Sequence, residues 1–128
     1  MRSLILAVAL SFGLGTAHAA TSASTANLDK GVILKGYDPV SYFKSPLPLK
    51  GKAEIKADLD GVTYLFATTA NRDEFLKTPK KYTPAYEGWC ATAVASGYKY
   101  DIDPENYKVT DGRLFLFYKG WKGDAKKD

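Results

Sequence analysis

The sequence predicts a small α+β domain in which two antiparallel β-hairpins alternate with several short helices. Two Asp-Gly pairs, Asp60-Gly61 and Asp111-Gly112, each stand between runs rich in apolar and aromatic residues. This pattern is typical of a two-residue type I′ turn, which needs positive φ at both central positions. Helix-capping residues and prolines occur between the two hairpins. The chain has 128 residues, 45% of them hydrophobic, so we expect one domain with its own core.

Residues 1–19 are expected to be a signal peptide. Arg2 precedes an apolar run from Leu4 to Leu14, and Ala17-His18-Ala19 offers the short side chains that a signal peptidase accepts. The run is too short to anchor the chain stably in a bilayer of about 30 Å. We therefore expect a periplasmic or secreted protein with no membrane anchor after cleavage; the alternative is an uncleaved amphiphilic N-terminus.

Residues 20–27 are rich in small polar side chains, which bury too little surface to become ordered, and are expected to form a flexible linker. The folded domain is assigned to residues 28–122, and residues 123–128 are assigned to a charged tail. Within the domain, Asp38-Pro39 is typical of an N-cap followed by proline at the first helical position. It predicts a short helix over Pro39–Phe43.

The segment Ala53–Ala67 is expected to form the first hairpin around Asp60-Gly61. If Leu59 pairs with Val62, one face of the hairpin is wholly apolar, which favours this register. The pairs expected on that face are Ala57 with Tyr64 and Ile55 with Phe66.

Thr68 or Thr69 can cap a helix that ends at Lys77 and turns Phe75 and Leu76 toward the sheet. Pro79 stops this helix and begins another turn.

The small residues Ala91–Ser96 predict a helix that ends at Gly97, a residue suited to the left-handed conformation. The second hairpin is expected to join Tyr107–Thr110 to Arg113–Tyr118.

Three segments in this order resemble the YHS domain family, in its exported single-domain branch. They are GYDPVSYF at Gly36–Phe43, YLFATTANRDEFLKTPKKYTPAYEGWCA at Tyr64–Ala91 and DPENYKVTDGRLFLFY at Asp103–Tyr118. The resemblance covers essentially the whole chain after the leader. It implies a small α+β domain of the kind found in copper-transporting ATPases, some hydroxylases and many exported proteins, with a role in metal binding or metal handling through cysteines.

The metal ligands that the resemblance implies are largely replaced in this chain. Ser41 and Ala67 stand where metal-associated members have cysteine, and Asn71 stands where a histidine or second cysteine is expected. Cys90 matches the exported branch. The resemblance therefore implies a possible transition metal such as copper, with Cys90 as its ligand.

One thiolate is too few for zinc, which needs four nitrogen or sulfur ligands, or for Cu(I), which needs at least two soft ligands. A homodimer that brings two Cys90 side chains together is one way to complete such a site. Alternatively, carboxylates such as Asp38, Asp101 and Asp103 hold a hard cation.

Cys90, the only cysteine of the chain, has two interpretations. It is either a small buried hydrophobe packed beside Trp89, or a thiol activated at the start of the helix that follows. In the second case it can form a mixed disulfide with a protein partner, react with an oxidant, or share a metal. Without a second cysteine it cannot resolve its own disulfide.

Aromatic residues concentrate around Cys90 and suggest a cleft for a ligand or a partner's side chain. The candidate ligand-binding residues are Cys90, Trp89, Tyr86, Tyr64 and Arg72, with Arg72 placed to pair with an anionic group. The alternative is that the aromatic residues only pack in the core.

No catalytic residues are expected, because the chain after the leader contains no histidine to activate a serine or cysteine. The net charge of +4 comes from scattered lysines without a long basic block, which argues against nucleic acid as a partner. The predicted function is an exported binding or metal-related accessory protein with Cys90 as its leading residue. The alternatives are a redox-active thiol protein acting through Cys90 and a non-catalytic aromatic-cleft module.

Overall fold

The computed structural model describes residues 21–127, so the predicted signal peptide lies outside the described residues. The α+β fold class is confirmed, with short helices placed between and beside small antiparallel sheets. In chain order the elements are β1 (Leu28–Asp29), β2 (Val32–Ile33), the 3-10 turn η1 (Leu34–Gly36), α1 (Ser41–Lys44), β3 (Lys52–Leu59), β4 (Val62–Phe66), α2 (Thr69–Lys77), α3 (Pro79–Tyr82), the 3-10 turn η2 (Ala85–Gly88), α4 (Ala91–Ala95), β5 (Asp103–Thr110), β6 (Arg113–Phe117), β7 (Lys119–Gly120) and β8 (Gly123–Asp124).

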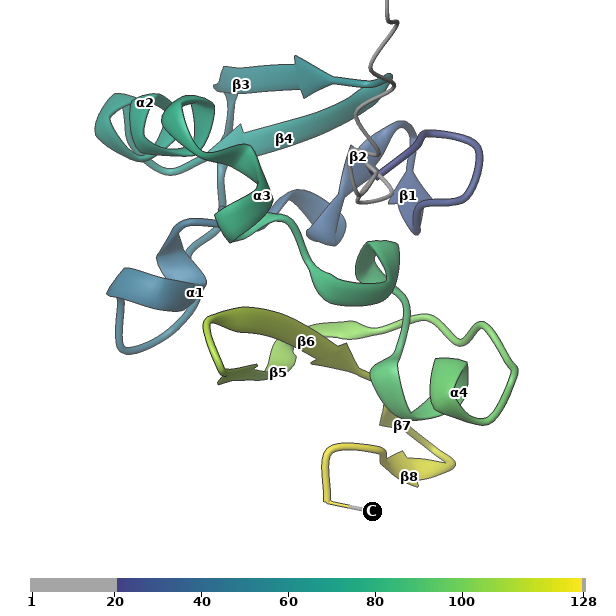
Figure 1. Cartoon of the computed structure of the whole chain (residues 1–128). Helices are drawn as coiled ribbons and strands as arrows, with labels where there is room; N and C mark the ends of the chain where they lie inside the picture. Colours follow the sequence, from purple (N-terminus) through teal and green to yellow (C-terminus); the bar gives the residue numbers. More distant parts are fainter. Residues whose placement is uncertain (1–20, 128) are drawn as a thin grey trace, which may run out of the picture.

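The larger sheet has the strand order β1-β2-β4-β3 and is packed against α2 (Figure 1). Its pairs are antiparallel except for β2 and β4, which run parallel. Phe75 of α2 is fully buried, and its ring centroid lies 4.6 Å from that of Tyr64 and 5.2 Å from that of Phe66. Burial of these rings fixes the helix on the sheet.

The first hairpin has the predicted turn, with φ of 53° at Asp60 and 77° at Gly61. Leu59 pairs with Val62 and Ala57 with Tyr64, as expected. The predicted pair of Ile55 with Phe66 is wrong, because the register shifts between Lys52 and Lys56 and Phe66 pairs with Lys52. A bulge inserts extra residues in one strand and so breaks the alternation from which the register was extrapolated.

The second hairpin, β5–β6, lies on the other side of η2 from the larger sheet, with α4 and the β7–β8 pair beside it (Figure 1). Its turn, Asp111-Gly112, has positive φ at both residues, as predicted. Leu114 and Leu116 of β6 are fully buried and join the same hydrophobic cluster as the larger sheet. The two sheets therefore share one core.

The predicted cap of α2 is confirmed, whereas α1 differs from its prediction. It covers Ser41–Lys44 instead of Pro39–Phe43, and its N-cap residue is Val40 instead of Asp38. Thr68 Oγ1 accepts a hydrogen bond from the Asn71 N–H at 3.1 Å and caps α2, whose end at Lys77 is also as predicted. Leu76 does not face the sheet, because its side chain is 53% exposed. No helix in residues 21–127 is long and apolar enough to cross a bilayer.

Both segments assigned to the periphery of the domain are bonded to it. Near the N-terminus, Asn27 Nδ2 donates to the Gly88 carbonyl at 3.1 Å, and Trp89 Nε1 donates to the Thr25 carbonyl at 2.8 Å. Near the C-terminus, β8 pairs with β7, and buried Asn106 donates to Asp124 Oδ1 at 2.8 Å. Residues on both sides of 28–122 are thus bonded to the domain, and the flexible linker over residues 20–27 and the charged tail over residues 123–128 stay predictions.

Candidate functional site

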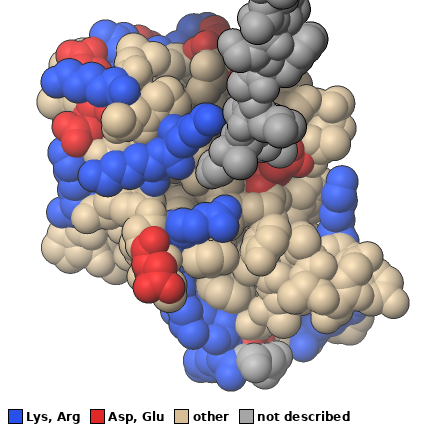
Figure 2. Space-filling view, in the orientation of Figure 1, with Lys and Arg blue, Asp and Glu red and all other residues tan. Residues whose placement is uncertain are grey.

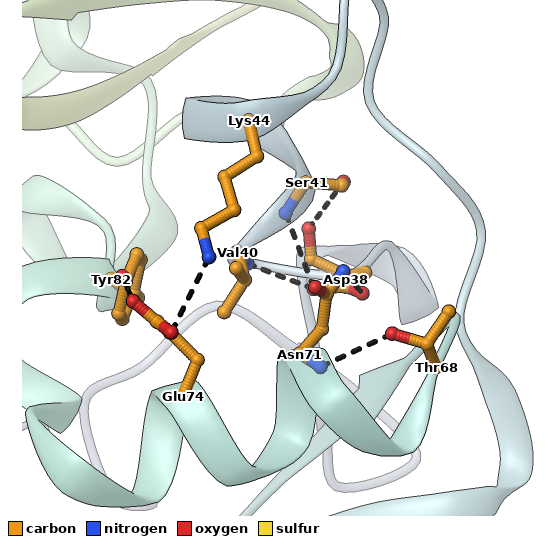
Figure 3. A network of polar contacts seen from close by, with 8 residues as sticks. All are labelled: Asp38, Val40, Ser41, Lys44, Thr68, Asn71, Glu74 and Tyr82. Carbon is orange, nitrogen blue, oxygen red and sulfur yellow. Dashed lines mark hydrogen bonds and ion pairs between the residues drawn. The ribbon is translucent and has the colours of Figure 1, made fainter.

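Asp38 forms the centre of a buried polar network between α1, the end of β4 and α2 (Figure 3). Its side chain is inaccessible to solvent. Oδ1 accepts hydrogen bonds from the backbone N–H groups of Val40 at 2.8 Å and Ser41 at 3.3 Å. Oδ2 accepts from the Ala67 N–H at 2.9 Å and from Asn71 Nδ2 at 2.7 Å. These donors satisfy the acceptor capacity of the carboxylate, so we call this network the Asp38 hub.

The Asp38 hub brings together the three positions that the YHS resemblance marks for metal ligands. Ser41, Ala67 and Asn71 all contact Asp38, although they lie on α1, in the loop after β4 and on α2. Ser41 Oγ is also fully engaged, because it donates to the Asp38 carbonyl at 2.6 Å and accepts from the Leu49 N–H at 2.9 Å. Since the hub has no thiolate or imidazole and its carboxylate is saturated, these residues do not fit copper or zinc.

The alternative cation site is not assembled either. Asp101 accepts from Lys35 Nζ at 2.7 Å, whereas Asp103 Oδ1 accepts from the Glu105 N–H at 2.9 Å as a local turn contact. Asp38 is committed to its hub. Within residues 21–127, no three His, Cys, Asp or Glu side chains gather closely enough to hold a metal ion.

Cys90 lies immediately before α4 and is 1% exposed. Its Sγ accepts a hydrogen bond from the Tyr118 N–H at 3.3 Å, and its own N–H donates to the Tyr100 carbonyl at 3.0 Å. The thiol therefore ties α4 to the chain after β6. This placement agrees with the interpretation of Cys90 as a small buried residue.

A cavity of about 220 Å³ opens above Cys90, between α4 and the C-terminal segment. Tyr98, Tyr100 and Tyr118 form its aromatic wall, and Lys122 lies at the same opening. The rings of Tyr98 and Tyr100 stack with their centroids 6.2 Å apart, and Tyr118 meets Tyr100 edge-on at 6.4 Å. An aromatic cavity thus lies beside Cys90, but Tyr98, Tyr100 and Tyr118 line it instead of the predicted Trp89, Tyr86 and Tyr64.

The aromatic wall continues across the surface to Trp121, whose side chain is 89% exposed. Lys122 Nζ lies 5.1 Å from the Trp121 ring centroid and 5.5 Å from that of Tyr100. Lys99 Nζ lies 5.7 Å from the Trp89 ring centroid. These distances are those of cation–π contacts, which hold the ammonium groups over the rings.

We call the whole region the aromatic–lysine surface. It consists of Trp89, Tyr98, Lys99, Tyr100, Tyr118, Trp121 and Lys122, over the floor made by Cys90. Sequence reasoning missed Trp121 and both lysines. A large aromatic residue between Gly120 and Lys122 in a polar segment was the signal available.

Three of the five predicted ligand-binding residues lie elsewhere. Tyr64 is 1% exposed in the core, and its hydroxyl has no hydrogen-bond partner that meets ordinary geometry in residues 21–127. Burial raises the pKa of Tyr64 to about 12, with a smaller opposing contribution from Thr21. Arg72 lies on α2 with Nε 3.9 Å from Asp73 Oδ1, and Tyr86 lies on η2 with its ring 6.2 Å from that of Phe115. Only Cys90 and Trp89 belong to the aromatic–lysine surface.

Comparisons of the chain with models of protein families, with curated proteins and with solved structures found no match. The YHS resemblance therefore rests on the three sequence segments alone.

Proposed function

We propose that this chain is an exported, non-catalytic binding module, similar to YHS domains, that holds a partner polypeptide on its aromatic–lysine surface. The observation that carries this proposal is the exposure of Trp121 (89%), Tyr98 (63%) and Tyr100 (45%) around two adjoining hollows. Trp121 lines one hollow, Tyr98 lines the other, and Tyr100 lines both. Contiguous exposed aromatic residues are uncommon on a monomer and mark interaction sites. Tyrosine and tryptophan are also enriched where binding energy concentrates in protein interfaces.

The charges on the surface favour an acidic partner. Neither Lys99 nor Lys122 has a carboxylate of residues 21–127 within 4.0 Å. The neighbouring acid, Asp101, is already bound by Lys35 and by Asn27 Nδ2 at 3.0 Å. Although burial acts in the other direction, these hydrogen bonds hold the pKa of Asp101 below its usual value. Asp101 therefore stays ionised and paired, and the two lysines stay available for acidic groups of the partner.

The size of the cavity favours a side chain of a polypeptide over a free small molecule. Its volume of about 220 Å³ lies below the range of about 300–1,000 Å³ that is usual for drug-sized ligands. An apolar or aromatic side chain can enter it while the flanking acidic residues meet Lys99 and Lys122. Cys90 and the Tyr118 N–H form the floor that such a side chain would reach.

The burial of Cys90 makes the other functions considered for this residue less suitable. Thiol exchange, oxidation and metal sharing between two chains all require an accessible sulfur, and Sγ here is covered and hydrogen-bonded. We therefore assign Cys90 a supporting role in the binding site.

The test is an NMR titration of the ¹⁵N-labelled protein with two short peptides, each with one central phenylalanine. Acidic residues flank the phenylalanine in one peptide and lysines flank it in the other. We expect the acidic peptide alone to shift amides, mainly in residues 98–100 and 118–122. Equal shifts with both peptides, or shifts centred elsewhere, would argue against the proposal.

Variants then locate the site. Trp121→Ala and Lys122→Gln should weaken binding of the acidic peptide, Trp121→Ala by at least about tenfold. Leu47→Ala is the matched control, because Leu47 is also an exposed apolar residue (72%) and lies outside the aromatic–lysine surface. It should bind as the unchanged chain does.

A further inference from the structure

A second hollow, of about 450 Å³, lies between α3, η2 and the start of β6. It shares no lining residue with the aromatic–lysine surface. Its lining residues include Lys80, Lys81, Pro84, Tyr86, Glu87 and Arg113. Figure 2 shows Lys and Arg side chains gathered in the middle of this face, in the region of α3.

The hollow carries an excess of positive charge. Lys80, Lys81 and Arg113 face a single acidic lining residue, Glu87. None of the three basic side chains has a carboxylate of residues 21–127 within 4.0 Å. Their charges are therefore available to an anion.

Rigid elements hold these basic residues. Lys80 and Lys81 lie on α3, which ends at Tyr82, a residue with 1% exposure whose hydroxyl donates to Glu74 Oε1 at 2.8 Å. Arg113 is the first residue of β6, and its guanidinium lies 5.7 Å from the Phe115 ring centroid. A site built on anchored elements loses little freedom when a ligand binds.

A strained turn supplies the apolar wall of the hollow. Tyr86 and Glu87 both have left-handed backbone conformations, with φ of 53° and 54°, which residues with a Cβ rarely adopt. The turn is held by hydrogen bonds from the Trp89 N–H to the Tyr86 carbonyl at 3.1 Å and from the Asn27 N–H to the Glu87 carbonyl at 3.0 Å. As a result, Tyr86 remains 45% exposed beside Pro84, where a flat group can pack on its ring.

We infer that this hollow binds a small molecule in which a phosphate monoester is attached to a planar ring. The volume lies within the usual range for small-molecule sites. A phosphate monoester carries about −1.5 to −2 charge near neutral pH, which matches three basic groups opposed by one acid. Arg113 and the two lysines would bind the phosphate oxygens, while the exposed ring of Tyr86 would pack against the ring of the ligand.

Phenyl phosphate, inorganic phosphate and phenol are the probes that test this inference, by calorimetry or NMR titration of the purified chain. We expect phenyl phosphate to bind more tightly than either of the other two, because only it carries both the charge and the ring. An affinity of phenyl phosphate no higher than that of inorganic phosphate would overturn the inference. So would binding that does not weaken as salt concentration rises.

Variants separate the two parts of the site. Arg113→Gln should lower the affinity for phenyl phosphate by at least about fivefold, and so should the double variant with Lys80→Gln and Lys81→Gln. Tyr86→Leu should weaken the binding of phenyl phosphate and leave the binding of inorganic phosphate unchanged. Lys108→Gln is the matched charge control, because Lys108 is an exposed lysine of β5 that lines neither this hollow nor the aromatic–lysine surface, and it should leave phenyl phosphate binding unchanged. Equal loss in the control, or no loss with Arg113→Gln, would show that the binding is not in this hollow.

Discussion

The Asp38 hub and the aromatic–lysine surface use polar and aromatic groups in opposite ways. In the hub, a fully buried carboxylate has its acceptor sites filled by protein donors, so nothing is left over for a ligand. At the surface, large rings remain in water, and the ammonium groups of Lys99 and Lys122 lie over those rings with no carboxylate of residues 21–127 within 4.0 Å. We therefore assign the hub to stability and propose the surface for binding, although the sequence resemblance draws attention to the hub.

The largest effect is expected from Asp38→Asn. This change keeps the shape of the side chain but turns an NH₂ group toward N–H donors and removes the charge that they stabilise. Leaving such buried groups unsatisfied should lower the free energy of unfolding by about 3 kcal/mol or more. Chemical denaturation measures it. Asp73→Asn, at an exposed and weakly paired acid, is the control and should change stability by less than about 0.5 kcal/mol. Similar free energies of unfolding for the two variants would show that the Asp38 hub does not contribute strongly to stability.

The two Asp-Gly turns allow a matched comparison of the two halves of the chain. Gly61→Val and Gly112→Val both place a β-branched residue at positive φ, so each should destabilise the fold by at least about 1 kcal/mol. A Cβ at Gly61 would also lie 3.0 Å from Ala23 Cβ, whereas nothing lies within 4 Å at Gly112. Gly61→Val should therefore melt at a lower temperature than Gly112→Val. The reverse order would mean that residues around Ala23 do not pack on the first turn.

The pH dependence of stability should also differ between the core around Tyr64 and Tyr82 and the C-terminal part around Asp124. Burial raises the pKa of Tyr64 to about 12, and burial together with the hydrogen bond to Glu74 raises that of Tyr82 to about 12. Both native-state pKa values exceed the usual 10.0, so stability that is present below pH 10 is lost as pH rises toward 12. Tyr64→Phe should reduce this alkaline loss at little cost near neutral pH, because the Tyr64 hydroxyl has no hydrogen-bond partner of ordinary geometry in residues 21–127.

In the C-terminal part, the expected sensitivity is to acid. Hydrogen bonds from Asn106 and from the Lys126 N–H hold the pKa of Asp124 below its usual value, with burial opposing them. A lowered native pKa stabilises the fold above the unfolded value, and this contribution is lost as pH falls through the native value. Asp124→Asn should therefore flatten the acid side of the stability profile, measured by thermal unfolding against pH. An unchanged acid profile would show that the contact with Asn106 does not hold the C-terminus.

Cys90 gives a smaller, kinetic test. Because its side chain is 1% exposed, alkylation of the native protein by iodoacetamide should be slow and should become fast when denaturant unfolds the chain. Rapid labelling without denaturant would restore the accessible, activated thiol as the better interpretation.

Local sequence signals predicted most of the fold. The Asp-Gly turns, the Thr68 cap and the Pro79 stop are each determined by neighbours in the chain, and the structure has all of them. The bulge in β3 was not predictable in this way. It lies near Gly51, where an added Cβ would fall 2.5 Å from the Leu65 carbonyl carbon, a close approach between strands that only the folded chain reveals.

Only part of the candidate site was predicted, because sequence patterns show which residues are neighbours in the chain and not which residues meet in the folded structure. Cys90 and Trp89 were found because the aromatic residues around them are close in sequence. Tyr64 and Arg72 were misplaced, because nearness in sequence does not show that Tyr64 points into the core and Arg72 lies on α2. Trp121 joins the surface only through the return of the chain after β6, which no local pattern encodes.

The affinity of Trp121→Ala for the acidic phenylalanine peptide tests the central claim most directly. Trp121 is almost fully exposed, so its removal should leave the unfolding temperature unchanged. We expect the variant to stay as stable as the unchanged chain and to bind the peptide at least about tenfold more weakly. Unchanged affinity in a stably folded variant would contradict the assignment of binding to the aromatic–lysine surface.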